Sequence, residues 1–276
     1  MDNIRIKPVW SKSKDEIWDE MFERLDEHPD DHIDDHPDDH LEDHPDEHRP
    51  REKGILRRIP VWGYAASLLI PVLLICHFYS ITVETARGEH VVVALPDHSM
   101  VTVNAESKVS YKPLEWFVSR RVKLQGEACF EVEHGSSFHV LSGSNRVKVL
   151  GTTFNVYARA EAYRVTCLTG RVEALAGKES VVLQANMQAV FDKRQFRVHD
   201  NVQSAAVTGW MQGMFVFVET PLNEVIAEVE RQYNVNVVAP DYDPNHLYTG
   251  NFSKLEKPEE ILEIIGKAYG LTFSIR

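Results

Sequence analysis

A run of 25 residues without a single Asp, Glu, Lys or Arg, Ile59–Val83, constrains the fold of this chain more than any other feature. At about 1.5 Å of rise per residue, roughly 20 apolar residues allow a helix to cross the hydrocarbon core of a bilayer. Glu84 is the first charge after the run, and five cations crowd the flank before it: Arg49, Arg51, Lys53, Arg57 and Arg58. Because positive flanks stay in the cytoplasm, we expect a single-pass membrane protein with residues 1–58 in the cytoplasm and residues 84–276 outside.

Two other interpretations of this run are open. A secretory signal peptide begins near the start of a chain, whereas 58 residues precede this run. A buried core helix is the stronger alternative, because Pro71 interrupts the run and Gly63 and Ser67 dilute it. Proline is tolerated inside membrane helices, so a transmembrane helix over residues 56–83 is the interpretation that the length favours.

The net charge of −12 is unevenly distributed along the chain. Residues 1–58 hold 19 acidic and 10 basic side chains, so the remaining 218 residues carry only −3. This balance argues against a nucleic-acid-binding surface anywhere in the chain. The part that follows the run is long enough for one or two domains with hydrophobic cores.

An acidic low-complexity tract over residues 26–55 separates the N-terminal segment from the run. Three tandem copies of an eight-residue unit place a histidine at every fourth position: His28, His32, His36, His40, His44 and His48. On a continuous helix these imidazoles would line one face and could bind a transition metal. Prolines at positions 29, 37 and 45 oppose that helix, so we expect an extended, solvated linker, with a metal-responsive protein as the alternative.

Residues 1–25 contain a short amphipathic pattern. Apolar residues recur at helical spacing at Trp18, Met21, Phe22 and Leu25, and acidic residues occupy other positions. So short a helix is marginal alone, and the acidic repeat offers it no core. We therefore expect this stripe, together with Trp10, to bind a partner protein, because the acidic face disfavours an anionic membrane surface.

Residues 84–200 are predicted to form an all-β domain. Short segments that alternate apolar and polar residues follow one another between turns, among them HVVVAL, MVTVN, RRVKLQG, ACFEVEHG, FHVLSG, RVKVLG, TFNVYA, RVTCLTG, RVEAL, SVVLQ and MQAVFD. Such spacing is typical of a β-sandwich or a stacked β-roll. Ser, His and Asp form no recognisable catalytic constellation, so we expect no enzyme and no cofactor.

A linker near residues 200–209 precedes a second domain over 210–276. There the pattern changes to two successive strand–helix–strand units, GMFVFVE–PLNEVIAEVER–NVNVVA and LYTGNFS–PEEILEIIGKAYG–LTFSIR. We expect Thr220 and Pro221 to cap and start the first helix, and Pro258 and Gly270 to bound the second. The sequence thus predicts a small α/β domain built from two βαβ halves.

Cys129 and Cys167 both fall among strand-like, apolar neighbours in the periplasmic part. They could form a disulfide in that oxidising compartment, or remain free as small core residues. Spacing alone leaves both possibilities open.

Five segments, in order, resemble the FecR family of membrane-bound anti-sigma factors: LPDHSMVTVNAESKVSY, VKLQGEACFEVEHG, VKVLGTTFNVYA, VTCLTGRVEA and GMFVFVETPLNEVIAEVERQYNVNV. His98 stands where the family usually has the glycine of a turn with positive φ. The resemblance implies a C-terminal domain like the short N-terminal domain of secretins and TonB-dependent transducers.

The resemblance also implies two partners. The signalling domain of a TonB-dependent outer-membrane transducer would bind within residues 213–276, and Trp10, Trp18, Met21, Phe22 and Leu25 would bind an extracytoplasmic-function sigma factor.

One site could carry chemistry. In Gly151–Thr152 the hydroxyl lies next to an unhindered carbonyl, as an N-to-O acyl shift requires, and some relatives are cut in the periplasm. The simpler interpretation is that Gly151 makes a tight bend before the next strand, so a self-cleaving signalling protein is a further alternative.

Overall fold

The computed structural model describes residues 78–160, 162–192, 194–238 and 242–276. Most of the predicted membrane run, the His tract and the N-terminal stripe lie outside these residues. No helix among the described residues is long and apolar enough to cross a membrane. The last residues of the run belong to a sheet, because the first strand already begins at Ile81.

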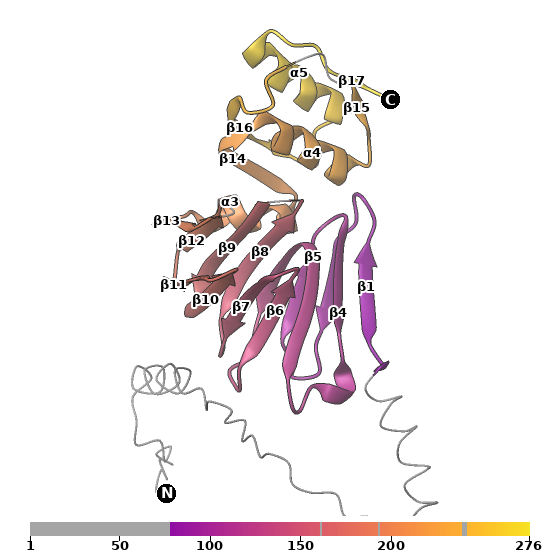
Figure 1. The fold of residues 1–276 in the computed structure, drawn as a ribbon. Coiled ribbons are helices and arrows are strands. Elements are labelled where there is room, and N and C mark those ends of the chain that lie inside the picture. The colour runs from indigo at the N-terminus through magenta and orange to yellow at the C-terminus, as the bar shows by residue number, and fades with distance from the viewer. Residues whose placement is uncertain (1–77, 161, 193, 239–241) are drawn as a thin grey trace, which may run out of the picture. The chain divides into compact units, whose positions relative to one another are not determined.

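Two sheets, one mixed and one antiparallel, share one long strand, β5 (Arg120–Glu131), and form the all-β domain (Figure 1). The first sheet adds β1 (Ile81–Thr85), β4 (Ser107–Tyr111), β6 (Phe138–Ser142), β7 (Asn145–Val149), β10 (Arg171–Ala176) and β11 (Glu179–Gln184). The second adds β2 (Val91–Ala94), β3 (Met100–Val103), β8 (Thr153–Arg159), β9 (Ala162–Thr169), β12 (Met187–Phe191) and β13 (Phe196–His199). The predicted all-β domain is confirmed, and it is a sandwich.

Strand β5 changes sheets at Gly126. Residues 122–125 pair with β4, whereas residues 126–131 pair with β8. Gly126 has φ +99°, and a Cβ there would collide with Ser107. The sequence suggested two strands on either side of this glycine, and this expectation was wrong because glycine lets one strand bend and continue.

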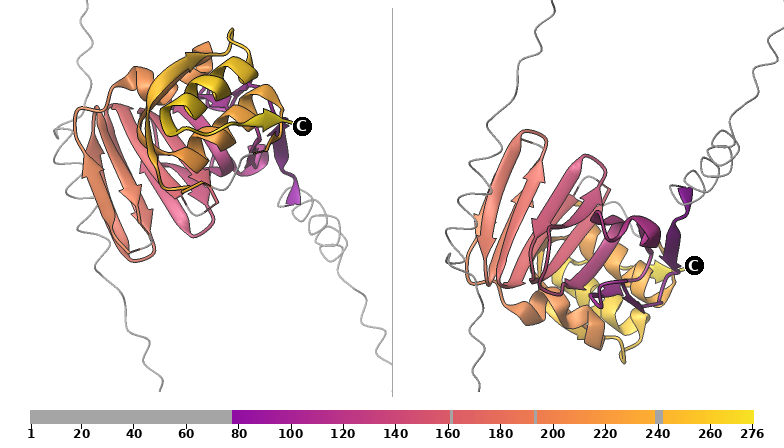
Figure 2. Two further views of the ribbon diagram at one scale, coloured as in Figure 1. Left: turned by 90° about the horizontal axis from the view of Figure 1, so that it is seen from above. Right: turned by 90° about the horizontal axis from the view of Figure 1, so that it is seen from below.

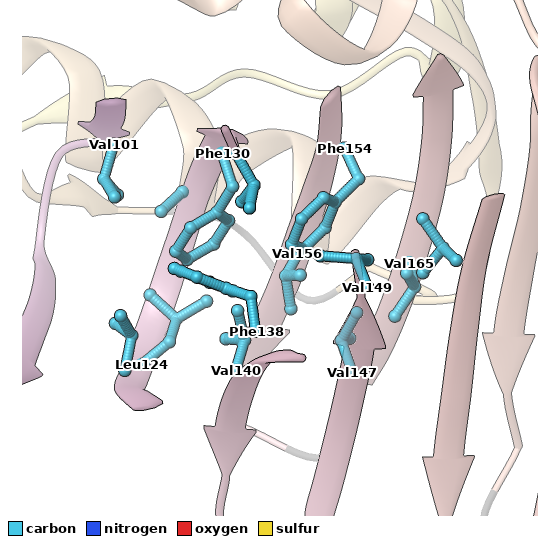
Figure 3. Close-up of a cluster of buried hydrophobic side chains, with 14 of the residues drawn as sticks. Val101, Leu124, Phe130, Phe138, Val140, Val147, Val149, Phe154, Val156 and Val165 are labelled. Atoms are coloured by element: carbon cyan, nitrogen blue, oxygen red, sulfur yellow. The ribbon is translucent and has the colours of Figure 1, made fainter. Parts of the chain in front are cut away.

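The core of the sandwich lies between its two sheets. Phe130 and Phe154 stack with ring centroids 5.1 Å apart, and Phe138 from the opposite sheet meets Phe130 edge to face (Figure 3). Valines of β6, β7, β8 and β9 surround these rings. Alternation along each strand sends every second side chain into this layer, which explains the period-2 pattern of the sequence.

The C-terminal domain comprises β14 (Met214–Pro221), α4 (Leu222–Tyr233), β15 (Val237–Val238), β16 (Leu247–Ser253), α5 (Pro258–Tyr269) and β17 (Ser274–Ile275). The strand–helix–strand order of both halves is as predicted. Strands of different halves pair antiparallel, β14 with β16 and β15 with β17. Viewed from above, these orange and yellow elements lie over one end of the sandwich (Figure 2).

Two details of this domain differ from expectation. Pro221 is the N-cap of α4 and no side chain caps the helix, because β14 continues through Pro221, which pairs with Leu247. The predicted linker contains α3 (Ser204–Thr208) and the 3₁₀ turn η2 (Gly209–Gln212), whose Trp210 is buried in the C-terminal core. The bounds expected for α5 are confirmed by Pro258 in its first turn and by Gly270 with φ +67°.

Candidate functional site

The C-terminal domain is joined to the sandwich by a buried polar seam. All the described residues belong to one compact unit, and the seam lies within it. We define the seam by three sandwich residues and three residues of α4: Asn104, Glu127, Asn155, Glu228, Arg231 and Gln232. All six are buried, which is unusual for charged and amide side chains and requires that they satisfy one another.

Gln232 is the link across the seam. Its Nε2 donates to Asn104 Oδ1 and to Glu228 Oε1, each at 2.8 Å. Asn104 in turn donates to Glu127 Oε2 at 2.8 Å, and Asn155 donates to Glu127 Oε1 at 2.9 Å. A continuous chain of hydrogen bonds therefore runs from the outer face of β5 and β8 into helix α4.

Two carboxylates sit close together in this seam. Burial raises the pKa of the Glu127 carboxyl, and the nearby Glu228 carboxylate raises it further. Arg159 and the amides of Asn155 and Asn104 oppose this increase in the pKa. Arg231 pairs with Glu228 at 2.7 Å, so the negative charge on the helix side is already balanced.

The loop after β1, which contains Gly88 and His90, also contacts helix α4 at the seam. Gly88 N donates to Arg231 O at 2.7 Å, and Lys254 Nζ donates to Gly88 O at 2.9 Å. His90 Nε2 lies 3.0 Å from Gln232 Oε1, and its ring meets Trp210 edge to face. Burial, followed by the positive charge of Lys254, lowers the pKa of His90.

A cleft of about 630 Å³ adjoins the seam between the second sheet and β14. Arg164 donates to Glu224 at 2.7 Å across this cleft and stacks over the Tyr157 ring at 3.9 Å. The pair ties the first turn of α4 to β9 in addition to the seam. Guanidinium stacking and pairing of this kind fix orientation more than they add stability.

The C-terminal domain presents open strand edges and isolated apolar side chains. Each of its sheets has only two strands among the described residues, so backbone donors and acceptors are left at the edges. Val218 on β14, Leu247 on β16 and Ile264 on α5 are all more than half exposed. Edges of this kind can pair with a strand of another protein.

At Gly151–Thr152 the structure supplies a packing reason for the glycine. A Cβ on Gly151 would lie 2.8 Å from His134 Cα. The Thr152 hydroxyl donates to Arg171 O at 3.0 Å, and its backbone pairs with Val132 in both directions. His134 lies beside Gly151, but the Thr152 hydroxyl hydrogen bond goes to the Arg171 carbonyl oxygen. Self-cleavage therefore stays a prediction.

Cys129 and Cys167 are both free and lie on opposite faces of the second sheet. Cys129 packs into the core of the C-terminal domain, whereas Cys167 belongs to the sandwich core. A disulfide between them would need one strand to reverse its faces.

His98 keeps the turn that the family pattern implies, with φ +67°.

The predicted partner-binding and metal-binding residues of the N-terminal 58 residues lie outside the described residues. Within the described ranges, no group of His, Cys, Asp and Glu could hold a metal ion. Sequence reasoning missed the seam altogether. One signal was available: GEACFEV lacks the alternation of its neighbours, and Glu127 and Cys129 are buried on the outer face because the C-terminal domain covers them.

Comparison with known proteins identifies the family of the chain. The family model of FecR protein matches residues 81–173, and that of the FecR C-terminal domain matches residues 214–276. A crystal structure of a proposed anti-sigma factor from Parabacteroides distasonis is 30% identical, with a TM-score of 0.63, over 70% of this chain and 92% of that one.

A second proposed anti-sigma factor structure from the same organism is 28% identical, again with a TM-score of 0.63, over 70% of this chain and 98% of the other. No curated protein matches the chain. The matched regions contain strands β1–β9 of the sandwich and the C-terminal domain, and so include both sides of the seam. The chain therefore belongs to the FecR family of anti-sigma factors, regulatory proteins of sigma-factor signalling.

Proposed function

We propose that this protein relays a signal from a TonB-dependent outer-membrane transducer to an extracytoplasmic-function sigma factor. In this proposal the run Ile59–Val83 anchors the chain in the inner membrane, with the N-terminus in the cytoplasm. Residues 10–25 bind the sigma factor, and the C-terminal domain binds the signalling domain of the transducer. The chain acts by binding and needs no cofactor.

One observation carries this proposal: β1 connects the end of the predicted membrane run directly to the seam. Ile81 pairs with Tyr111 at one end of β1, and three residues beyond Thr85 at the other end Gly88 binds α4. A change in how the C-terminal domain sits on the seam would therefore act on the strand that continues into the membrane.

The open edge of β16 is the surface we propose for the transducer. Leu247 is 59% exposed, and residues 249 and 251 of the same strand are also exposed. An added strand would satisfy the edge backbone groups, and Leu247 would be buried in the contact.

Co-purification of the full chain from induced cells tests the proposal. We expect both a sigma factor and a TonB-dependent transducer to be recovered. Leu247→Asp should retain the sigma factor and lose the transducer, because the charge would be buried at the new edge. Val182→Asp on β11, 44% exposed in the native protein, is the matched control and should retain both. Recovery of the transducer with Leu247→Asp would reject this surface.

Sidedness has its own test. Protease added outside intact spheroplasts should degrade the sandwich and the C-terminal domain and spare residues 1–58.

Metal response is tested by deleting residues 26–49. A relay tolerates the shorter linker, whereas a metal-responsive protein would lose its signal.

A further inference from the structure

An exposed apolar tip lies beside the point where the chain enters the sandwich. We define the tip as Leu114, Phe117 and Val118, in the connection between β4 and β5 that contains η1 (Pro113–Glu115). Their exposed fractions are 53%, 97% and 92%. Nearly complete exposure of adjacent Phe and Val side chains is costly in water and marks a contact surface.

The tip is held rigidly. Trp116, which lies between the exposed residues, is only 4% exposed and packs edge to face against Tyr111 and Phe138, with centroids 5.7 and 5.9 Å away. Val118 N donates to Glu115 O at 3.0 Å, and Lys112 pairs with Glu115 at 3.0 Å. The connection therefore presents its apolar side chains outward on a buried anchor, at little entropic cost when it binds.

The position of the tip indicates what covers it. Ile81, the first residue of β1, pairs with Tyr111, the last residue of β4, and Leu114 follows Tyr111 by three residues. Tyr79, half exposed, lies close enough to Tyr111 that, after burial, it contributes to the raised pKa of that phenol. Three residues span at most about 10 Å, so Leu114 lies close to the start of β1, where the chain enters the sandwich.

Two cations follow the tip on the outer face of β5. Arg121 and Lys123 are exposed, and no carboxylate among the described residues pairs with either. Arg121 lies opposite His139, whose pKa is lowered to about 4 by burial and then by Arg146, Lys148 and Arg121. An exposed apolar tip followed by two exposed cations matches a bilayer interface with anionic headgroups.

We propose that Leu114, Phe117 and Val118 insert into the interface of the bilayer that anchors the chain, with Arg121 and Lys123 on anionic headgroups. The inference rests on the membrane anchor of the proposed function and goes beyond the relay. Tethering through the run holds the tip near the surface at high effective concentration, so a small apolar area is sufficient. The docked tip would fix the orientation of β1 relative to the membrane, with the C-terminal domain on the side away from the bilayer.

Fluorescence quenching in nanodiscs tests this docking with the full chain. Phe117→Cys carries an environment-sensitive fluorophore in a Cys76→Ser background, because Cys129 and Cys167 are buried and free. The matched control carries the label at Val182→Cys on β11. Lipids with a nitroxide near the headgroup should reduce emission at position 117 about twofold or more and leave position 182 unchanged. Arg121→Gln with Lys123→Gln should weaken the quenching in anionic nanodiscs only.

Each other outcome overturns the proposal in a distinguishable way. A chain that enters nanodiscs but shows no lipid quenching at position 117 has an anchor without docking. Protection of position 117 from aqueous iodide without lipid quenching means that a protein, such as a second copy, covers the tip. Failure of the chain to enter nanodiscs would reject both the membrane anchor and the docking of the tip. Sigma-factor binding, the other part of the proposed function, can still be measured with such a chain.

Discussion

Gln232 of α4 donates a hydrogen bond to Asn104 of the sandwich at 2.8 Å, although 128 residues separate them in the sequence. This bond connects the C-terminal domain to the Glu127 network of β5 and β8. Because the seam is buried, its groups have no water to replace a lost partner. The relative position of the two domains therefore depends on a few identifiable side chains.

Gln232→Leu should destabilise the protein and weaken signalling. The substitution removes the hydrogen bonds that Gln232 donates to Glu228 Oε1 and to Asn104 Oδ1 in the buried seam, which costs about 1–3 kcal/mol. Urea unfolding of the detergent-solubilised chain measures the loss, and sigma-dependent transcription measures the signal. Gln125→Leu, on an exposed position of β5, is the control. Equal effects of the two substitutions would contradict a role of the seam.

The raised pKa of Glu127 predicts a pH dependence of stability. The folded state holds the Glu127 proton more tightly than the unfolded state does, so its contribution is present below the unfolded pKa and is lost as pH rises toward the folded pKa. Relative to the wild type, Glu127→Gln should therefore gain stability as the pH rises above the unfolded pKa of the Glu127 carboxyl. Glu131→Gln, exposed on the same strand, should show no such gain. Parallel curves for wild type and Glu127→Gln would refute the assignment.

The two cysteines should stay free and react slowly. Burial raises the pKa of the Cys129 thiol to about 12 and that of Cys167 to about 11, so little thiolate is present at neutral pH. Mass spectrometry after non-reducing alkylation should find both thiols modified only once the protein is unfolded. A peptide that joins Cys129 to Cys167 would show that the two faces of the sheet are wrongly assigned.

Gly151→Ala should lower the melting temperature, because the new Cβ would approach His134 Cα to 2.8 Å. Thr153→Ala, on a half-buried neighbouring position, should have a smaller effect. If packing alone explains this glycine, immunoblots show only full-length chain with or without inducer. A periplasmic fragment that disappears in Thr152→Ala and persists in Thr153→Ala would instead establish self-cleavage.

Local patterns in the sequence predicted the strands of the sandwich and both long helices, since a buried face imposes a period of 2 or 3.6 on nearby residues. Gly126 could not be interpreted in this way. Its turn signal is real, but whether a strand ends or bends there depends on Ser107, which lies 19 residues earlier. Pro221 was misjudged for a similar reason: its pairing with Leu247 extends β14 at the expense of the helix.

The seam could not be predicted because its partners are far apart in the sequence. Nothing near Asn104 indicates Gln232, and a polar residue at an outward strand position usually faces water. The one local sign in the sequence was GEACFEV, which lacks the apolar–polar alternation of the neighbouring strands, and the structure shows residues 126–130 buried without a break. Polar contacts between domains become visible only once the fold brings them together.

The central claim is that residues 10–25 hold a sigma factor under the control of the C-terminal domain. Pull-down of the sigma factor by the full chain, with the apolar stripe altered by Trp18→Ala and Phe22→Ala, tests it most directly. Glu16→Ala with Glu20→Ala changes the polar face as the control. We predict that the stripe variant loses the sigma factor and the control retains it. Retention of the sigma factor by both variants would contradict the account.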